Sequence, residues 1–506
     1  MLICFASRVI TFANNPVIID ADQALYLEIA KLMIQGKILY LQIWEWNPPL
    51  IAYLNIIPMK TAMLLGLPAP FVLNCMCLSL VSISTISSLS IARCYLPKAD
   101  LLRMLPMIIG FFIACNSFWF ILAEREHLFI TLVFPLLLVR YIHCEYNISV
   151  PGWLSIALGA FASLGILLKP QFILCYLGFE VALYFATKPG YVYRTSEFKA
   201  LVMCTAIYLL SLILLPYDAW KTYCSEILPI YINGYEWSKR PILDLLSAGV
   251  NERSTTLAFL TSTIIGIFTF KRHSLMPPLI VLMYIAMFNY LYGGQQWHYR
   301  AFPLYASALL IQGLAAGMLI EPIRKRRPRV WLAINPIKLL LSKNCAHNDR
   351  LFESRQEALS QKFDLRCCGY RGKSLKYGTD EVFDIIINNT TLDDNIVFLG
   401  TGINPGYPAI LQSNRRQLSR FPFCVVGHIF CAQQRATDNR WNALLEKVVS
   451  THTREIQLNK PKLVFIESDA LVPILKKYQF FEKCMGNYSL LQQEPIKEHY
   501  LVFIRR

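Results

Sequence analysis

Nine apolar runs in the first 320 residues constrain this chain more than any other feature. They lie at about 70–92, 104–122, 128–142, 153–168, 171–186, 199–216, 255–270, 274–292 and 302–320. About 17–25 apolar residues suffice to cross a bilayer as a helix. Only 16% of the 506 residues are charged, against about 25% in a soluble domain. The runs predict a polytopic α-helical membrane protein and exclude a disordered chain, a collagen-like fibre or a small disulfide scaffold.

The chain changes character after residue 320. Residues 1–320 carry 20 Lys+Arg and 15 Asp+Glu, whereas residues 321–506 carry 29 and 18. Helix-like and strand-like segments alternate through residues 345–506, which predicts a small soluble α/β domain. We expect a membrane domain at 1–329, a connector at 330–344 and the soluble domain at 345–506. The basic excess suits a membrane surface better than nucleic acid, for which no motif is present.

The 15 cysteines indicate neither a disulfide framework nor a metal site. No CxxC pair occurs, and several cysteines lie inside the apolar runs, where cysteine behaves as a small hydrophobic residue. We therefore assign no metal ligand from the sequence.

Charge between the runs predicts how the chain crosses the membrane. Five basic segments fall on one side when the spans are counted, at 93–103, 140–143, 188–199, 271–272 and 324–329. The positive-inside rule makes that side the cytoplasm. The outer segments are then 13–69, 123–127, 169–170, 217–254 and 293–300. Span counting also places residues 345–506 in the cytoplasm.

Both ends of the first outer segment depart from a simple count of spans. Residues 50–66 are apolar, but a span there would invert the charge pattern, so we expect a helix along the membrane surface. Only about 13 residues precede the first outer loop, so we expect a partial or truncated first span and about ten spans in all.

The first outer loop begins with two acidic residues at the membrane edge, Asp20 and Asp22. An acidic residue there can cap the helix that follows, bind a metal or act as a general base. Tyr26-x-x-x-Ala30, Gly36, Tyr40 and a Pro-Pro pair follow in order.

A second group of ionisable residues fills the turn between two apolar runs. Glu124, Arg125, Glu126 and His127 stand in a row. Such residues can simply be solvated, yet a tight turn does not need four ionisable side chains. The turn is therefore a candidate part of a site.

Two further outer segments carry basic residues. Lys169 lies at the end of a run, where a lysine can extend to the interface or contact a phosphate. His298 and Arg300 follow a Gly-Gly pair and could bind a phosphate, while the neighbouring Trp297 and Tyr299 are typical of membrane interfaces.

The first loop and the 123–127 turn together resemble the GT-C membrane glycosyltransferases. The likeness is greatest to glycosyltransferase family 39, the protein O-mannosyltransferase and aminoarabinose transferase group. It implies a GT-C-like fold with Asp20 as the catalytic carboxylate and Glu126, or Glu124 as the alternate, as the second. Asp22 departs from the adjacent Asp-Glu pair that is commoner in the family. The resemblance implies substrate-binding roles for Asp22, Tyr40, Glu124, Arg125, Lys169, His298 and Arg300.

The resemblance also implies a reaction. A sugar would pass from a polyprenyl-phosphate donor to a hydroxyl of a glycan, lipid or protein acceptor, with inversion, at the extracytoplasmic face of a bacterial inner membrane. Family members differ in their use of a divalent metal ion, and no other cofactor is expected. The alternatives are a transporter, for which no internal repeat is visible, and a non-catalytic subunit of polysaccharide assembly.

Overall fold

The computed structural model describes residues 20–326 and 379–506, except 118–120, 189–194, 235–237, 248, 418, 422–424, 436–438 and 492–498. The chain forms two compact units. The first, here the helical unit, comprises Met1–Ser7, Asn74–Ile213 and Lys239–Lys362. The second, here the loop–tail unit, comprises Arg8–Leu73, Leu214–Ser238 and Phe363–Arg506. The predicted first span and the 330–344 connector lie outside the described residues.

The helical unit confirms the nine apolar runs as helices. Its elements are most of α4 (Ala69–Tyr95), then α5 (Lys98–Ser117), α6 (Arg125–Tyr146), α7 (Gly152–Leu167), α8 (Pro170–Thr187), α9 (Ser196–Ile213), α12 (Ile242–Ser247), α13 (Val250–Thr269), α14 (Met276–Gly293), η5 (His298–Ala301) and α15 (Phe302–Arg326). Seven described helices are long and apolar enough to cross a membrane, and α7 and α13 are the two predicted spans outside that set. The chain is a multi-pass membrane protein.

Small residues allow the closest helix contact in this unit, between α5 and α15. Gly313 and Gly317 stand four positions apart on α15, the spacing that lets membrane helices approach through their backbones. A Cβ at Gly317 would lie 1.9 Å from the Arg103 carbonyl oxygen, and one at Gly313 would lie 2.7 Å from the Pro106 carbonyl oxygen. Any larger residue at either position would push the two helices apart.

The loop–tail unit begins with α2 (Ala21–Ile34) and α3 (Leu50–Leu65), which pack together. Asp20 and Gln23 form a capping box at the start of α2, so the capping expected at Asp20 is confirmed. Three short helices follow, α10 (Tyr217–Thr222), η3 (Tyr223–Ile227) and α11 (Leu228–Gly234), which together are here the α10–α11 segment. That α3 lies along the membrane surface stays a prediction.

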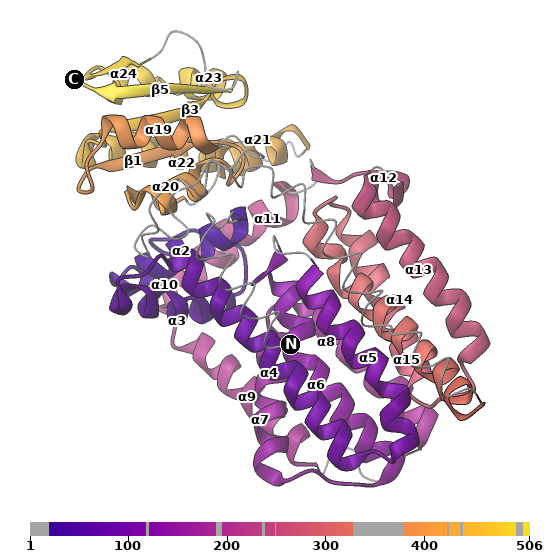
Figure 1. The fold of residues 1–506 in the computed structure, drawn as a ribbon. Helices are drawn as coiled ribbons and strands as arrows, with labels where there is room; N and C mark the ends of the chain where they lie inside the picture. The colour runs from indigo at the N-terminus through magenta and orange to yellow at the C-terminus, as the bar shows by residue number, and fades with distance from the viewer. Residues whose placement is uncertain are drawn as a thin grey trace, which may run out of the picture. The chain divides into compact units, whose positions relative to one another are not determined.

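The tail, residues 379–506, supplies a five-stranded sheet with the order β2-β1-β3-β5-β4. Its elements are α19 (Thr379–Asn389), β1 (Asn395–Leu399), α20 (Gly406–Ser413), β2 (Arg416–Gln417), α21 (Val425–Arg435), α22 (Arg440–Asn459), β3 (Leu463–Glu467), α23 (Ser468–Lys477), α24 (Phe480–Cys484), β4 (Tyr488–Leu490) and β5 (Tyr500–Arg505). Strands β1, β2 and β3 are parallel, and β5 is antiparallel to β3 and β4. Phe398 and Phe465 pair in register and stack at 4.1 Å in the core. The predicted α/β tail is confirmed (Figure 1).

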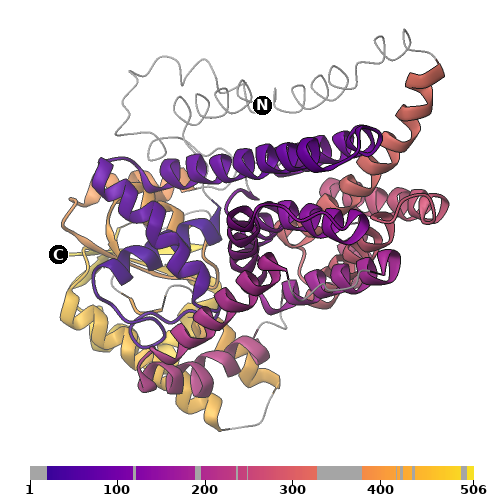
Figure 2. The same cartoon turned by 90° about the horizontal axis from the view of Figure 1, so that it is seen from below.

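The tail packs directly on the first loop and on the α10–α11 segment. Helix α20 contacts α2, and α21 contacts α11 (Figures 1 and 2). Lys31 of α2 donates to the carbonyl of Arg415 across 384 positions of sequence. Segments in contact lie on one side of a membrane. The tail and the first loop therefore share a side, which contradicts the span count that placed them on opposite sides.

Candidate active site

Asp20 lies at the N-terminus of α2, where its Oδ1 accepts a hydrogen bond of 2.8 Å from the Ala21 N–H. Burial, which is the largest cause, and the negative charge of Asp22 raise the pKa of this carboxyl from 3.8 to about 6, and the Ala21 hydrogen bond acts in the opposite direction. A carboxylate that titrates near pH 6 is a better proton acceptor than an ordinary aspartate, while remaining ionised at neutral pH.

Tyr40 is a buried structural residue of the first loop. It holds a left-handed backbone conformation with φ of 66°, which is uncommon for a bulky side chain. Its ring packs 4.5 Å from that of Tyr223, and its hydroxyl donates to the Asn47 carbonyl at 2.8 Å. These contacts fix the path of the loop, and a direct contact of Tyr40 with substrate stays a prediction.

Glu45 is a buried carboxylate of the same loop that the sequence reasoning missed. Glu45 is only 1% exposed to solvent. Glu45 Oε1 accepts the Asn47 N–H at 2.8 Å and also the Asn47 side-chain amide, which in turn donates to the Tyr26 hydroxyl at 3.2 Å. The sequence signal that could have identified Glu45 was its position between two tryptophans, shortly before the Pro-Pro pair. An acidic residue in such an apolar setting is expected to be buried, and a buried acid requires a specific partner.

The turn between α5 and α6 is buried, not solvated. Glu124, Arg125, Glu126 and His127 are all at most 4% exposed. His127 Nε2 lies 3.0 Å from the Cys115 carbonyl oxygen. Ala123 turns the chain into this arrangement with φ of 67°. Four buried ionisable side chains in succession require compensating charge or polar ligands.

Lys169, just before α8, supplies part of that charge. Its ammonium forms a buried ion pair with Glu126 and lies 5.5 Å from the centre of the Tyr299 ring. The charges of Arg125 and Arg300 also act on Lys169. Glu126 Oε2 is buried without a hydrogen-bond partner among the described residues. Arg125 and Arg300 are thus close enough for their charges to act on Lys169, and the three basic side chains together with Glu126 form a charged region that can bind an anion.

The segment between α14 and α15 contributes the remaining predicted residues. Arg300 lies over the Trp297 ring at 4.6 Å and donates to Gln295. His298 Nδ1 is 3.3 Å from Oε1 of Glu252, a buried carboxylate in the first turn of α13. Glu252 was not predicted, since its sequence position looks like an ordinary helix start.

The predicted residues fall in two groups. Asp20, Asp22 and Tyr40 belong to the loop–tail unit, while Glu124, Arg125, Glu126, Lys169, His298 and Arg300 belong to the helical unit. Within the described part of the chain, no three His, Cys, Asp or Glu side chains are arranged to hold a metal ion.

Comparison with solved structures gives two close architectural matches. One is ArnT from Cupriavidus metallidurans bound to undecaprenyl phosphate, with a TM-score of 0.54 and 12% sequence identity. The other is the same protein in the apo state, with a TM-score of 0.51 and 12% identity. Each alignment covers 99% of this chain and 97% of the other. No family model and no curated protein matches the sequence. At this identity the likeness establishes the fold, which is of the GT-C type with a C-terminal α/β region.

Proposed function

We propose that the protein is a membrane glycosyltransferase. It moves a sugar from a polyprenyl-phosphate donor to an acceptor hydroxyl at the extracytoplasmic face of a bacterial inner membrane. The observation that carries the proposal is the full-length architectural likeness to ArnT, which was solved with undecaprenyl phosphate. The basic cluster of Arg125, Lys169 and Arg300, in which Arg125 and Lys169 are buried, supports it, because a phosphate is the anion that such a cluster suits.

The proposed reaction is a direct displacement. The acceptor oxygen forms a bond to the anomeric carbon while the bond from that carbon to the donor phosphate breaks. The bonding electrons leave with the phosphate, and the anomeric centre inverts. Lys169, Arg125 and Arg300 stabilise the charge that grows on the departing phosphate. A phosphate leaves without a proton, so the reaction needs a base and no acid, unlike the glycosidases with their two carboxylates.

Asp20 is the base in this proposal. It takes the acceptor proton as the oxygen attacks, and its pKa near 6 is consistent with that task. Glu126, with Glu124 as the alternate, orients the acceptor or binds a metal ion. His298 and Arg300 contact the donor phosphate, and Asp22 and Tyr40 contact substrate from the first loop.

The test is transfer from a panel of radiolabelled polyprenyl-phosphate sugars into membrane extracts. Wild type is compared with Asp20→Asn, Lys169→Met and the control Lys271→Gln, whose side chain is exposed. We expect Asp20→Asn to lower transfer by about 10²–10⁴-fold, the usual contribution of a general base. Lys271→Gln should match wild type.

Three other outcomes would change the proposal. Equal transfer by wild type and Asp20→Asn would remove Asp20 as the base and leave Asp22 and Glu126 to be tested. Movement of labelled lipid across the membrane of a vesicle, without transfer of its sugar to an acceptor, would favour a transporter. The non-catalytic subunit would be favoured if the protein neither transferred sugar nor moved lipid with any donor, while a partner enzyme gained activity in the presence of the protein.

A further inference from the structure

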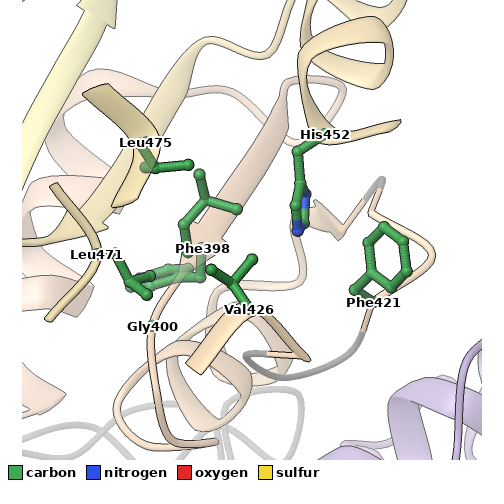
Figure 3. A pocket seen from close by; sticks show the side chains of 8 residues that line it. Phe398, Gly400, Phe421, Val426, His452, Leu471 and Leu475 are labelled. Atoms are coloured by element: carbon green, nitrogen blue, oxygen red, sulfur yellow. The ribbon is translucent and has the colours of Figure 1, made fainter. Parts of the chain in front are cut away.

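The segment Trp44–Asn47 of the first loop is held by the tail from its N-terminal side. The Trp44 N–H donates to the Arg420 carbonyl at 2.8 Å. The Trp44 ring meets the edge of the Phe421 ring at 4.9 Å, and both residues are at most 4% exposed. Phe421 in turn lies 4.8 Å from His452 of α22, beside a small cavity of the tail (Figure 3). The tail core therefore extends through Phe421 to the loop.

The same segment is held again on its C-terminal side. The Trp46 ring lies 4.9 Å from the His428 ring of α21, and both residues are 5% exposed. The Trp46 carbonyl accepts a hydrogen bond of 3.1 Å from the Tyr223 hydroxyl. Trp46 thus lies between the tail and the α10–α11 segment.

His428 has little freedom to move, because α11 packs against its other side. A Cβ at Gly234, the last residue of α11, would lie 2.7 Å from the His428 carbonyl oxygen and 2.9 Å from its Cβ. Contacts this short exclude any side chain at position 234 without displacement of α21. The backbone of His428, whose ring packs on Trp46, therefore lies directly against the backbone of α11.

The buried Glu45 carboxylate lies between these two anchors. Its orientation depends on the local hydrogen bonds to Asn47, and those depend on the backbone path of residues 44–47. We infer that the tail holds the Trp44–Asn47 segment in its working conformation, with Phe421 and His428 as positioning residues. The effect on catalysis rests on the proposed function, whereas the effect on the loop does not.

Hydrogen exchange on the full-length protein tests the inference apart from catalysis. His428→Ala removes the ring that Trp46 packs against. Backbone amides of residues 43–47 should then exchange about tenfold faster, since local opening becomes easier, while β1 and β3 stay protected. His428→Phe keeps a ring and should restore protection. His499→Ala, which removes an exposed side chain of the tail, is the matched control.

Transfer is measured on the same variants. His428→Ala should lower transfer by about tenfold, chiefly in kcat, and His428→Phe should remain near wild type, which a histidine acting as an acid or base would not allow. If His428→Ala does not fold, Gly234→Ala perturbs the same contact from α11 and should also speed exchange at residues 43–47.

Unchanged exchange at residues 43–47 in His428→Ala or Gly234→Ala would overturn the inference. Faster exchange with undiminished transfer would overturn its catalytic part. A wild type that transfers no sugar from any donor would count against the proposed function alone, because the exchange measurement decides the loop contact independently.

Discussion

Asp20 serves two purposes whose demands differ. As a helix cap it needs only an oxygen that accepts the Ala21 N–H. As a base it needs a negative charge and a raised proton affinity, which burial and Asp22 provide. Asparagine caps a helix about as well as aspartate but cannot accept the proton. Asp20→Asn therefore separates the two roles, and at pH 7 its thermal stability should equal or exceed that of wild type, because a pKa raised by burial means that the ionised carboxylate costs stability in the folded state.

The pH profile of transfer follows from the same residue. The pKa of Asp20 is about 6, and only the deprotonated form accepts a proton. Transfer should rise about tenfold per pH unit below pH 6 and level off above it. The measurement is kcat/KM for the donor as a function of pH, with the acceptor at a saturating concentration. A profile that is flat between pH 4.5 and 7 would contradict Asp20 as the base, whereas a matching profile in Asp20→Asn would assign the titration to another group.

Among elements, α6, α8 and α9 are joined by a buried charge network centred on Arg140. The Arg140 side chain is fully buried and bonds both oxygens of Glu180, at 2.8 and 3.0 Å, and one oxygen of Glu197 at 3.2 Å. Tyr176 donates to Glu180 at 2.8 Å. Every group in the network depends on the arginine, so its loss leaves buried negative charge without compensation.

We expect Arg140→Ala to lower the free energy of unfolding by about 3–5 kcal/mol, the usual result of removing one partner from a buried ion pair. Thermal unfolding in detergent measures it. A triple variant, Arg140→Met with Glu180→Gln and Glu197→Gln, removes charge of both signs and should recover most of the loss. Transfer per folded molecule should not change. Equal stability of wild type and Arg140→Ala would mean that water or lipid headgroups compensate the glutamates.

Arg140 also shows what an apolar pattern can and cannot predict. The runs located nine helices because length and hydrophobicity are local properties. The pattern ended one run at 142 and assigned Arg140 to a cytoplasmic loop, but α6 continues to Tyr146 and buries it. The pattern near residue 140 could not predict this burial, because the partners Glu180 and Glu197 come from two later helices. For the same reason, the sequence alone could not decide whether the turn at 124–127 is buried, since its partner Lys169 is 43 positions away from Glu126.

For the whole molecule, the largest difference from expectation is the side of the tail. The alternation of helix-like and strand-like segments predicted for the tail is confirmed in residues 379–506, because each segment has its own local periodicity. Their docking on α2 and α11 was not predictable, since it joins residues as far apart as Lys31 and Arg415. Counting spans depends on every crossing being recognised, and one missed crossing reverses the predicted side of all that follows.

The side of the tail can be measured with reporter fusions. Alkaline phosphatase fused after Arg506 should be active and green fluorescent protein fused there should be dark, because the first is active only outside the cytoplasm and the second fluoresces only inside. The same reporters fused after Lys188, at the end of α8, should give the opposite result, since basic residues near span ends favour the cytoplasm. A fluorescent fusion at Arg506 would place the tail in the cytoplasm. Because α20 packs on α2, Asp20 would then lie on the cytoplasmic side as well, and the proposed transfer would need a donor on that side.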